Sequence, residues 1–513
     1  MPARYNTPMR RLAYLHPFFF LLGSILFLYS QSAIIASPDQ MIRPLLTLTA
    51  VLILLAYPAY WLARDWGWAS ILLSVFVLGF CSTQSYFLAA GVLAVAVLLL
   101  WVAVSRIRRR PVKLQQANGM LTLASFLLAV SLAFPLVRLW IGIPRPPVRP
   151  ADAIPIQASS VTSTPDIYYI VLDGYARADV LADIYRFDNS TFVRTLESRG
   201  FVVPDKSRAN YPKTALSVTS TLNMDYITSI APNLQDQPFW WLMSPLLDHS
   251  RARATLEGLG YQTVSLTSDW GITDNPTTDV YLSPKPIVLS DFESQLLART
   301  PLKMVGSLLG RAAFVPSFDA HRELIRFQFE TLADVPSIPG PKFVVAHIVA
   351  PHPPFVFDAD GNPLEPAYPF SFHDANDFPF SDETYRQGYV GQVEYVNGQV
   401  IQMIDAILAK SAAPPIIILQ ADHGPGMLTD FRSSTNTCLK ERFSIFAAYY
   451  LPGANADAIP ADVTSVNLFR IVFNEYFHAE LPLLERAHFY YKDTVYIFRA
   501  EDVTGQVDTC TGQ

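Results

Sequence analysis

The sequence predicts an N-terminal multi-span α-helical membrane domain followed by an extracytoplasmic α/β domain, with a mainly parallel sheet and helices on both faces. Two observations lead to this prediction. First, 51% of the 513 residues are hydrophobic and only 16% are charged, and the apolar excess lies in the first 141 residues, which is too apolar for an ordinary soluble enzyme. Second, apolar runs alternate with helical patterns from about residue 165 onward, as in proteins with a parallel sheet.

The first 141 residues contain five apolar segments, each about long enough to cross a bilayer. The third segment is the shortest, and its loop to the fourth is almost absent. The first segment is not a cleavable signal peptide, because four further segments follow and no small-residue cleavage site is evident. The expected spans are Leu15–Ala36, Pro44–Ala63, Trp68–Ser85, Phe87–Ser105 and Leu121–Trp140.

Basic residues between these segments predict the orientation of the membrane domain. Arg10 and Arg11 precede the first span, Arg64 lies between the second and third, and a basic cluster at residues 106–113 lies between the fourth and fifth. All three places fall on one side of the membrane, which should be the cytoplasm. Five spans with the amino end inside place everything after Trp140 on the outer side.

The remaining chain divides into a linker and one large domain. Residues 142–164 are rich in Pro, Ser, Thr and Ala, which predicts an extended, semi-rigid linker. Residues 165–513 are long enough to bury a large core. Two cysteines of this domain, Cys438 and Cys510, can form a disulfide outside the cytoplasm or remain free thiols. Cys81, in the third span, is expected to serve packing.

Strands and helices alternate through the large domain. Its β-branched apolar runs are typical of strands buried in a parallel sheet. Residues 269–340 have a weaker pattern, and we interpret them as an insertion that lines or covers a site. No dinucleotide or Walker glycine motif is present. The expected strands are 166–172, 201–203, 342–350, 416–419 and 443–451; the expected helices are 191–199, one near 212–224, 292–308, 321–332, 383–410 and 463–477; and residues 245–267 read as a helix and a strand.

Several of these strands end in side chains suited to a ligand site. Asp173 follows the first strand, His352 follows the strand at 342–350, and Asp422 and His423 follow the run at 416–419. In open α/β sheets, ligands bind at the carboxyl ends of the strands. Asp and His are good ligands for a divalent metal, although a turn with an Asp cap and a surface His is the alternative for the Asp-His pair.

Thr214 supplies a candidate nucleophile. Pro212 suits the first turn of a helix, so Thr214 lies near a helix start, where free N–H groups and the helix dipole favour an anion. A hydroxyl needs a base or a metal to lose its proton. Asp173, Asp422 and His423 can hold a divalent ion against the Thr214 oxygen, and His352 can bind a phosphate or protonate a leaving oxygen. Further cationic candidates for binding a substrate are Lys213 and Arg442.

The order of these motifs resembles that of the alkaline phosphatase and sulfatase superfamily: Asp-Gly, a Thr at a helix start, a His-Pro loop, then Asp-His-Gly. Five spans followed by such a domain are similar to lipoteichoic acid synthase and the phosphoethanolamine transferases of bacterial envelopes. In those families the first carboxylate, the Thr and the Asp-His pair bind a metal, and the Thr carries the phosphoryl intermediate. The resemblance therefore implies metal ligands at Asp173, Thr214, Asp422 and His423, catalysis by Thr214, and substrate binding by His352.

The sequence departs from the family pattern at several positions, and these departures restrict the expected substrate and the expected number of metal ions. The first ligand is Asp where those transferases usually have Glu, and the sulfatase signature Cys/Ser-x-Pro-x-Arg is missing, which disfavours sulfate esters. No Asp-x-x-x-His is placed like a second metal site, so one divalent ion, Zn or Mn, is expected. The later His of the transferases has no clear match, and Lys440 or Arg442 are possible substitutes for it.

The function implied is a metal-dependent, membrane-anchored phosphotransferase. It would move a phospho-alcohol group from a phospholipid donor to an envelope glycan or lipid through phospho-Thr214, with no role for nucleic acid. The expected location is a bacterial-type cytoplasmic (inner) membrane, multi-pass, with the catalytic domain on the extracytoplasmic side. The alternatives are a phosphoric or sulfuric ester hydrolase of the same superfamily, and a catalytically inactive envelope scaffold.

Overall fold

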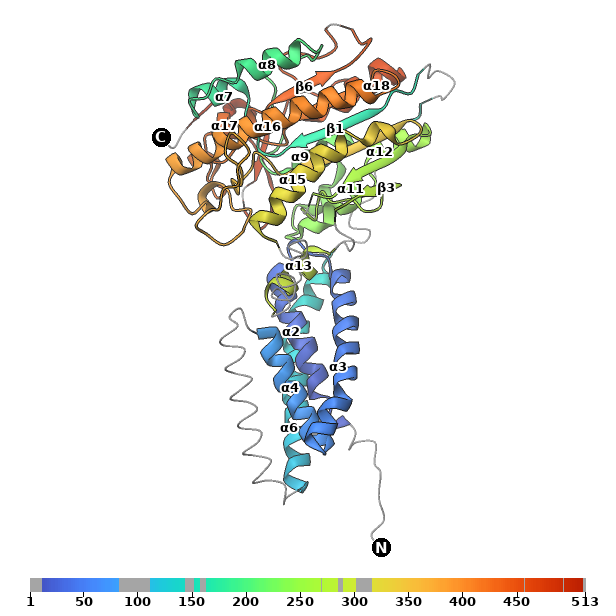
Figure 1. Cartoon of the computed structure of the whole chain (residues 1–513), viewed down its shortest axis with the longest axis vertical. Coiled ribbons are helices and arrows are strands. Elements are labelled where there is room, and N and C mark those ends of the chain that lie inside the picture. Colours follow the sequence, from blue (N-terminus) through green and yellow to red (C-terminus); the bar gives the residue numbers. More distant parts are fainter. Residues whose placement is uncertain are drawn as a thin grey trace. The chain divides into compact units, whose positions relative to one another are not determined.

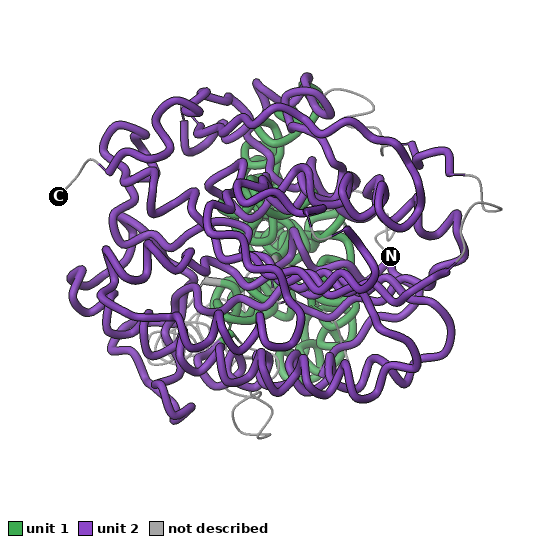
Figure 2. Tube along the Cα trace, turned by 90° about the horizontal axis from the view of Figure 1, so that it is seen from above, with its two compact units in different colours: residues 1–143, 287–316 green, residues 144–286, 317–513 purple. Residues whose placement is uncertain are grey.

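The computed structural model describes residues 12–82, 111–143, 152–156, 163–268, 270–284, 289–300, 316–455, 457–491 and 493–510. The chain divides into two compact units, one of residues 1–143 and 287–316 and the other of residues 144–286 and 317–513 (Figure 2). The segment 287–316 therefore belongs to the first unit, although in sequence it lies within the second.

The first unit is helical (Figure 1). Its helix α2 packs against α4 and α6, and α3 packs against α4. Two segments, Pro38–Ala63 and Leu114–Ile141, are long and apolar enough to cross a membrane, and Trp66–Cys81 is a shorter apolar helix. The described helices are α2 (His16–Ser32), η1 (Pro38–Met41), α3 (Ile42–Ala63), α4 (Trp66–Ser82), α6 (Pro111–Ile141) and α13 (Asp291–Ala298).

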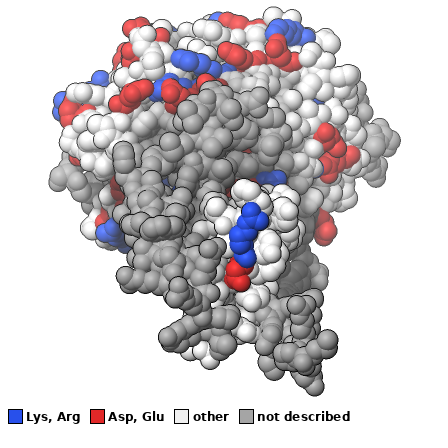
Figure 3. All heavy atoms as spheres, turned by 60° about the horizontal axis from the view of Figure 1, so that its bottom comes forward, with Lys and Arg blue, Asp and Glu red and all other residues white. Residues whose placement is uncertain are grey.

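Four of the five expected spans correspond to α2, α3, α4 and α6, and the fourth, Phe87–Ser105, lies outside the described residues. Large apolar side chains such as Ile53, Leu54 and Phe134 are exposed along α3 and α6. On the face seen in Figure 3, the described surface of this unit is mostly uncharged. Exposed apolar side chains on apolar helices are what a bilayer, rather than water, accommodates.

Helix α13 comes from the region that the sequence predicted to line or cover the site. It packs within the helical unit instead, on α2 and η1. Phe292 meets the ring of Tyr29, with 5.8 Å between the centroids, and Glu293 pairs with Arg43. Ser290 and Glu293 form a capping box at the start of the helix. Part of the predicted insertion therefore belongs to the helical unit.

The second unit is built on a six-stranded sheet with the order β3-β2-β4-β1-β5-β6. All neighbouring pairs are parallel except β5 and β6, so the prediction of a mainly parallel sheet is confirmed. Every residue of the central strands β1 and β5 is buried. The strands are β1 (Ile167–Leu172), β2 (Gln262–Leu266), β3 (Val280–Leu282), β4 (Lys342–Ile348), β5 (Ile416–Gln420) and β6 (Ala447–Tyr450).

Helices cover both faces of this sheet. Alternate side chains of a strand point to opposite faces. Tyr168, Ile170 and Leu172 of β1 enter one core cluster with residues of α15 (Phe318–Leu332) and α16 (Asp382–Lys410). Tyr169 points the other way and meets Phe469 of α18 (Leu468–Phe477), with 5.4 Å between the ring centroids. The helices predicted at 321–332, 383–410 and 463–477 are therefore present, with shifted ends.

Shorter elements complete the unit. The strand expected at residues 201–203 is only an isolated bridge between Val202 and Tyr449. The start of the strand expected at 443–451 is helical, because Phe443 closes α17. The remaining described elements are α7 (Ala178–Asp183), α8 (Ser190–Glu197), α9 (Thr214–Asn223), α10 (Ile227–Ile230), η3 (Pro232–Leu234), η4 (Trp240–Met243), α11 (Ser244–Asp248), α12 (Arg251–Gly258), η6 (Val335–Ser337), η7 (Ala375–Asp377), η8 (Ser434–Asn436), α17 (Leu439–Phe443), η9 (Ser465–Asn467), β7 (Phe489–Tyr491), β8 (Ala500–Asp502) and η10 (Thr504–Gln506).

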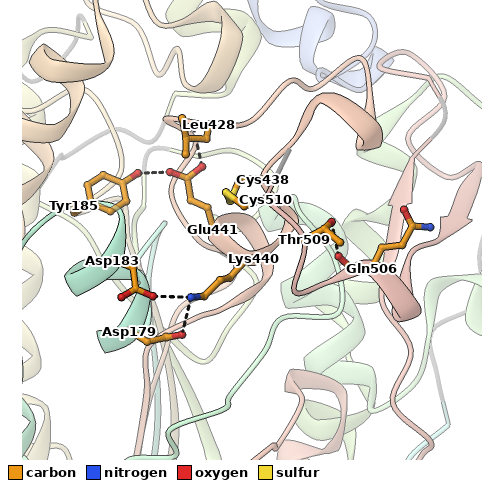
Figure 4. The surroundings of a disulfide bond; sticks show 10 residues. All are labelled: Asp179, Asp183, Tyr185, Leu428, Cys438, Lys440, Glu441, Gln506, Thr509 and Cys510. Carbon is orange, nitrogen blue, oxygen red and sulfur yellow. Dashed lines mark hydrogen bonds and ion pairs between the residues drawn. A yellow bond between two sulfur atoms is a disulfide. The ribbon is translucent and has the colours of Figure 1, made fainter. Parts of the chain in front are cut away.

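A disulfide joins Cys438 and Cys510, the pair considered from the sequence. Cys438 immediately precedes α17, so the bond ties the end of the chain to that helix (Figure 4). In the next turn, the Glu441 carboxyl accepts hydrogen bonds from the Tyr185 hydroxyl (2.6 Å) and the Leu428 N–H (2.8 Å). Helix α17 is therefore held at its start by the disulfide and at its centre by the hydrogen bonds of Glu441.

Candidate active site

The candidate site lies where the carboxyl ends of β1 and β5 meet the start of α9. Asp173 follows β1, Asp422 and His423 follow β5, and Thr214 is the first residue of α9. Because β1 and β5 are neighbouring parallel strands, their polar ends come together. The Gly174 N–H donates to Asp422 Oδ1 at 3.1 Å and thereby fixes one carboxylate against the other loop.

The protonation of His423 follows from its contacts. Its Nδ1 lies 2.9 Å from the carbonyl oxygen of Gly424, which can only accept, so Nδ1 carries the proton and Nε2 presents a lone pair. That Nε2 is 3.2 Å from Thr214 Oγ1 and from Asp422 Oδ2, and 3.6 Å from Asp173 Oδ1. Burial, together with the charge of Arg442, lowers the pKa of His423 to about 4, which keeps the imidazole neutral.

The donor set fits a divalent cation. Asp173 Oδ1 and Asp422 Oδ2 are buried, and neither has a hydrogen-bond partner among the described residues. Two carboxylate oxygens and an unprotonated imidazole nitrogen thus face one another, an arrangement that costs free energy unless a cation lies between them. Carboxylate, imidazole and hydroxyl donors are compatible with Zn or Mn. The structure therefore brings Asp173, Thr214 and Asp422 within 3.6 Å of His423 Nε2, and these four residues are the ligands that the resemblance implies.

His347 joins the same group from β4. Asp173, His347 and Asp422 each offer a ligand atom, and these atoms lie within 4.8 Å of one another. His347 Nε2 is 3.1 Å from Asp173 Oδ2, and its Nδ1 is 2.7 Å from the hydroxyl of Thr273. Burial opposes ionisation of Asp173, but His352, the hydrogen bond to His347 and the nearby His423 together hold the pKa of Asp173 below its ordinary range. His347 thus orients Asp173 and leaves the other oxygen of that carboxylate facing His423.

A second polar cluster adjoins the first. Arg442 Nη1 donates to Asp374 Oδ2 at 2.9 Å, and Nη2 lies 3.3 Å from His423 Nε2. The same Asp374 oxygen is 3.8 Å from His352 Nε2, and the Tyr385 hydroxyl donates to Asp374 Oδ1 at 2.7 Å. Arg442 and Asp374 are both buried, so their pairing is largely shielded from solvent. Asp374 therefore holds the predicted residues Arg442 and His352 in place.

Lys213 lies next to Thr214 and is half-buried. Its ammonium is 3.8 Å from the ring centroid of Phe431, 5.2 Å from that of Trp240 and 5.4 Å from that of Tyr491. Burial and the neighbouring Arg442 guanidinium lower the pKa of Lys213 to about 7. The side chain predicted as a cationic candidate for substrate binding thus lies among aromatic faces beside the nucleophile.

Sequence reasoning missed part of the site. The His-Pro motif favours His352 over His347, and the sequence pattern assigns no role to Asp374 or Tyr385. Lys440, considered as a substitute for the later His, pairs with Asp183 at 2.8 Å and Asp179 at 3.5 Å, whereas Arg442 lies in the site (Figure 4). The position of His347 opposite Val171 of β1 follows from strand order, which no local motif encodes.

Comparison with known proteins finds likenesses in structure only. No protein-family model and no curated protein matches the chain. One similar solved structure is the C-terminal periplasmic domain of EcEptC from Escherichia coli in complex with Zn: 11% identical, TM-score 0.46, covering 71% of this chain and 100% of that one. Another is the phosphonate monoester hydrolase of Agrobacterium radiobacter: 12% identical, TM-score 0.42, covering 64% of this chain and 80% of that one.

A third is the integral membrane protein lipooligosaccharide phosphoethanolamine transferase A (EptA) from Neisseria meningitidis: 12% identical, TM-score 0.38, covering 91% of this chain and 95% of that one. All three TM-scores are below 0.5, so the chemistry proposed below is derived from the residues of this chain. The solved structures similar to this chain thus include a phosphoethanolamine transferase, one of the kinds of protein that its sequence motifs resemble.

Proposed function

We propose that the chain is a metal-dependent, membrane-anchored phosphotransferase that moves a phospho-alcohol group from a phospholipid to an envelope glycan or lipid. The observation that carries this proposal is the position of the Thr214 hydroxyl. It lies at a helix start, 3.2 Å from the unprotonated Nε2 of His423, next to two buried carboxylate oxygens that have no hydrogen-bond partner in the described part of the chain. A hydroxyl in such surroundings is a nucleophile when its proton is removed.

Asp173, Thr214, Asp422 and His423 would hold one Zn or Mn ion. When bound, the ion favours the ionised hydroxyl and neutralises the charge of a phosphoryl group. The free N–H groups at the start of α9 favour the phosphoryl oxygens, and the fixed guanidinium of Arg442 adds charge-assisted hydrogen bonds. These groups are in place before a substrate arrives, as electrostatic stabilisation of the transition state requires.

The reaction would proceed in two displacements. In the first, Thr214 Oγ forms a bond to phosphorus, the bond between phosphorus and the lipid oxygen breaks, and diacylglycerol leaves as an alcohol. In the second, an acceptor hydroxyl bonds to phosphorus and the bond to Thr214 breaks. In each displacement the attacking hydroxyl loses one proton and the leaving oxygen gains one. The two steps together therefore neither release nor consume a proton.

His352 is the proposed proton donor for the leaving lipid oxygen. Its Nδ1 is 2.5 Å from the Pro353 carbonyl oxygen, so Nδ1 carries a proton and Nε2 is the nitrogen available to a substrate. Asp374 Oδ2 lies 3.8 Å from that Nε2. His352 also lies next to the metal-binding group, with 6.3 Å between its ring centroid and that of His423.

The proposed location is the extracytoplasmic side of a bacterial-type inner membrane, with a multi-pass anchor. The two long apolar segments of the helical unit support an anchor, and the Cys438–Cys510 disulfide supports an oxidising compartment for the α/β unit. A membrane anchor places the site near phospholipid donors, which a water-soluble esterase would not require.

Intact-protein mass spectrometry tests the proposal. Wild type and Thr214→Ala are incubated with membrane phospholipids and Mn or Zn. An adduct on the wild type alone is expected, and its mass identifies the transferred group. Release of diacylglycerol that depends on an added acceptor distinguishes a transferase from a hydrolase, for which water suffices. An adduct on both proteins, or no bound metal together with no adduct on either, would overturn the proposal.

A further inference from the structure

The ammonium group of Lys213 occupies an aromatic cage. The three rings that surround it come from η4 (Trp240), from the loop after β5 (Phe431) and from β7 (Tyr491). All three centroids lie within the range over which a cation is attracted to an aromatic face. Such cages are a common means by which proteins bind the ammonium groups of ligands, but here the chain fills the cage with its own lysine.

The surroundings of the cage are positively charged. Arg442 lies over the same Phe431 ring, with 5.2 Å from its guanidinium carbon to the centroid. The Asp374 carboxylate, whose charge acts on both cations, is engaged by Arg442 at 2.9 Å. Since Lys213 directly precedes Thr214, this positive charge lies beside any phospho-alcohol group attached to the nucleophile.

Two residues of the cage also carry a buried polar side-chain atom. Trp240 Nε1 and the Tyr491 hydroxyl are buried atoms with no hydrogen-bond partner among the described residues. Tyr491 as a whole is only 2% exposed. An indole N–H donates and a phenol both donates and accepts, so the pair suits the hydroxyl groups of a polyol. A cationic amine would gain no acceptor from the indole and would be repelled by Lys213.

We propose that Lys213 determines headgroup specificity: the site takes phospho-alcohols with a neutral polyol, such as glycerol, and rejects those with a cationic amine, such as ethanolamine or choline. The inference rests on the function proposed above and specifies its substrate class. It assigns Trp240, Phe431 and Tyr491 to the wall of the headgroup subsite. Removing the lysine charge should open the cage to the amines that the wild type excludes.

Binding of soluble headgroup phosphates tests this inference without any need for turnover. Isothermal titration of the full chain in detergent, with Mn present, compares glycerol 3-phosphate, phosphoethanolamine and phosphocholine. We expect the wild type to bind glycerol 3-phosphate about tenfold more tightly than either amine. Lys213→Met should lose this preference and gain affinity for phosphocholine, whereas Lys213→Arg, which keeps the charge, should retain it.

Lys410→Met provides the matched control, because Lys410 is an exposed lysine at the end of α16, paired with Asp334. Its selectivity should equal that of the wild type. The inference would be overturned by any of three results. These are equal or reversed preference in the wild type, no binding of any headgroup phosphate, and unchanged preference in a folded Lys213→Met. Selective binding without a Thr214 adduct would contradict the proposed transfer reaction but support the specificity, so the two failures are distinguishable.

Discussion

The hydroxyl of Thr214 lies 3.2 Å from Nε2 of His423, although the two residues are 209 positions apart in the sequence. The contact exists because α9 begins where β5 ends, and because the Gly424 carbonyl accepts the imidazole proton at Nδ1 and leaves Nε2 unprotonated. Nucleophile and ligand are thereby oriented toward one point, on which Asp173 Oδ1 and Asp422 Oδ2 also converge. The predictions below test this convergence and the contacts that support it.

Removing one of the two carboxylates that lie near His423 Nε2 should weaken metal binding. Asp173→Asn loses the charge of the oxygen that faces His423, and we expect the affinity for Zn or Mn to fall by about 100-fold or more. Metal content after dialysis, measured by inductively coupled plasma mass spectrometry, checks this. Asp166→Asn is the matched control, because Asp166 lies just before the opposite end of β1 and pairs with Lys342 at 2.6 Å. Equal metal content in both variants would contradict the assignment of Asp173.

The strand ends of this site could be predicted from the sequence because a short local pattern marks each of them. An apolar run followed by Asp173, or by Asp422 and His423, marks a strand and its polar end without knowledge of its neighbours. His347 differs because it lies within β4, and its partner Asp173 becomes apparent only when β4 and β1 are known to pair. Local patterns carry no information on that pairing.

Asp374 was beyond prediction for a related reason. It precedes the short turn η7, in an irregular loop without periodicity, and its partners Arg442 and Tyr385 come from α17 and α16. The packing of α13 in the helical unit could not be predicted either, because the sequence of an amphipathic helix does not specify which surface the helix packs against. Contacts that loops and insertions make with distant elements are therefore among those that the sequence did not reveal.

Substituting Asp374 should affect stability and substrate affinity together. Asp374→Asn leaves the guanidinium of Arg442 buried without its carboxylate, which we expect to cost about 3–5 kcal/mol in the free energy of unfolding. The KM for a phospholipid donor should rise, because Arg442 loses its fixed position. Thermal unfolding and steady-state kinetics measure the two effects.

Asp334→Asn is the control for Asp374. Asp334 forms a pair with Lys410 at 2.6 Å, but both side chains are largely exposed, so the loss should be about 1 kcal/mol or less. A similar small loss in Asp374→Asn, with unchanged KM, would mean that the buried cluster does not position Arg442.

His488 should make the folded state sensitive to acid. Its Nδ1 donates to the Ala209 carbonyl oxygen at 2.9 Å, and burial lowers the pKa of the imidazole from 6.5 to about 4. Between pH 6.5 and pH 4 the unfolded chain therefore binds a proton that the folded chain does not, and stability falls as the pH falls. The full difference is about 3 kcal/mol.

The His488→Gln variant tests this dependence. It keeps a side-chain donor for Ala209 but cannot titrate, so its Tm should fall less than that of the wild type between pH 7 and pH 5. The comparison concerns the change in Tm with pH, which is independent of any constant loss caused by the smaller side chain. Equal decreases in the two proteins would exclude His488 as the source of acid sensitivity.

The disulfide between Cys438 and Cys510 should support the site through α17. The backbone N–H of Arg442 donates to the Cys438 carbonyl oxygen at 3.2 Å. The disulfide fixes Cys438, and through this hydrogen bond Cys438 fixes the first turn of α17, the helix that carries Arg442. The bond closes a loop with a sequence separation of 72, for which the loss of stability on its removal is about 2–5 kcal/mol. We expect Cys510→Ser, or reduction of the wild type, to lower the Tm and the transfer rate.

Cys81→Ser is the control for this prediction, because Cys81 is a free cysteine in α4. That variant should keep the response of the wild type to dithiothreitol, and Cys510→Ser should lose it. If reduction lowers the Tm but leaves the transfer rate unchanged, α17 holds Arg442 without the disulfide, and the glutamate contacts of that helix suffice. If both quantities fall together, as we expect, the covalent bond is part of what positions Arg442, because no other covalent link joins the chain end to α17.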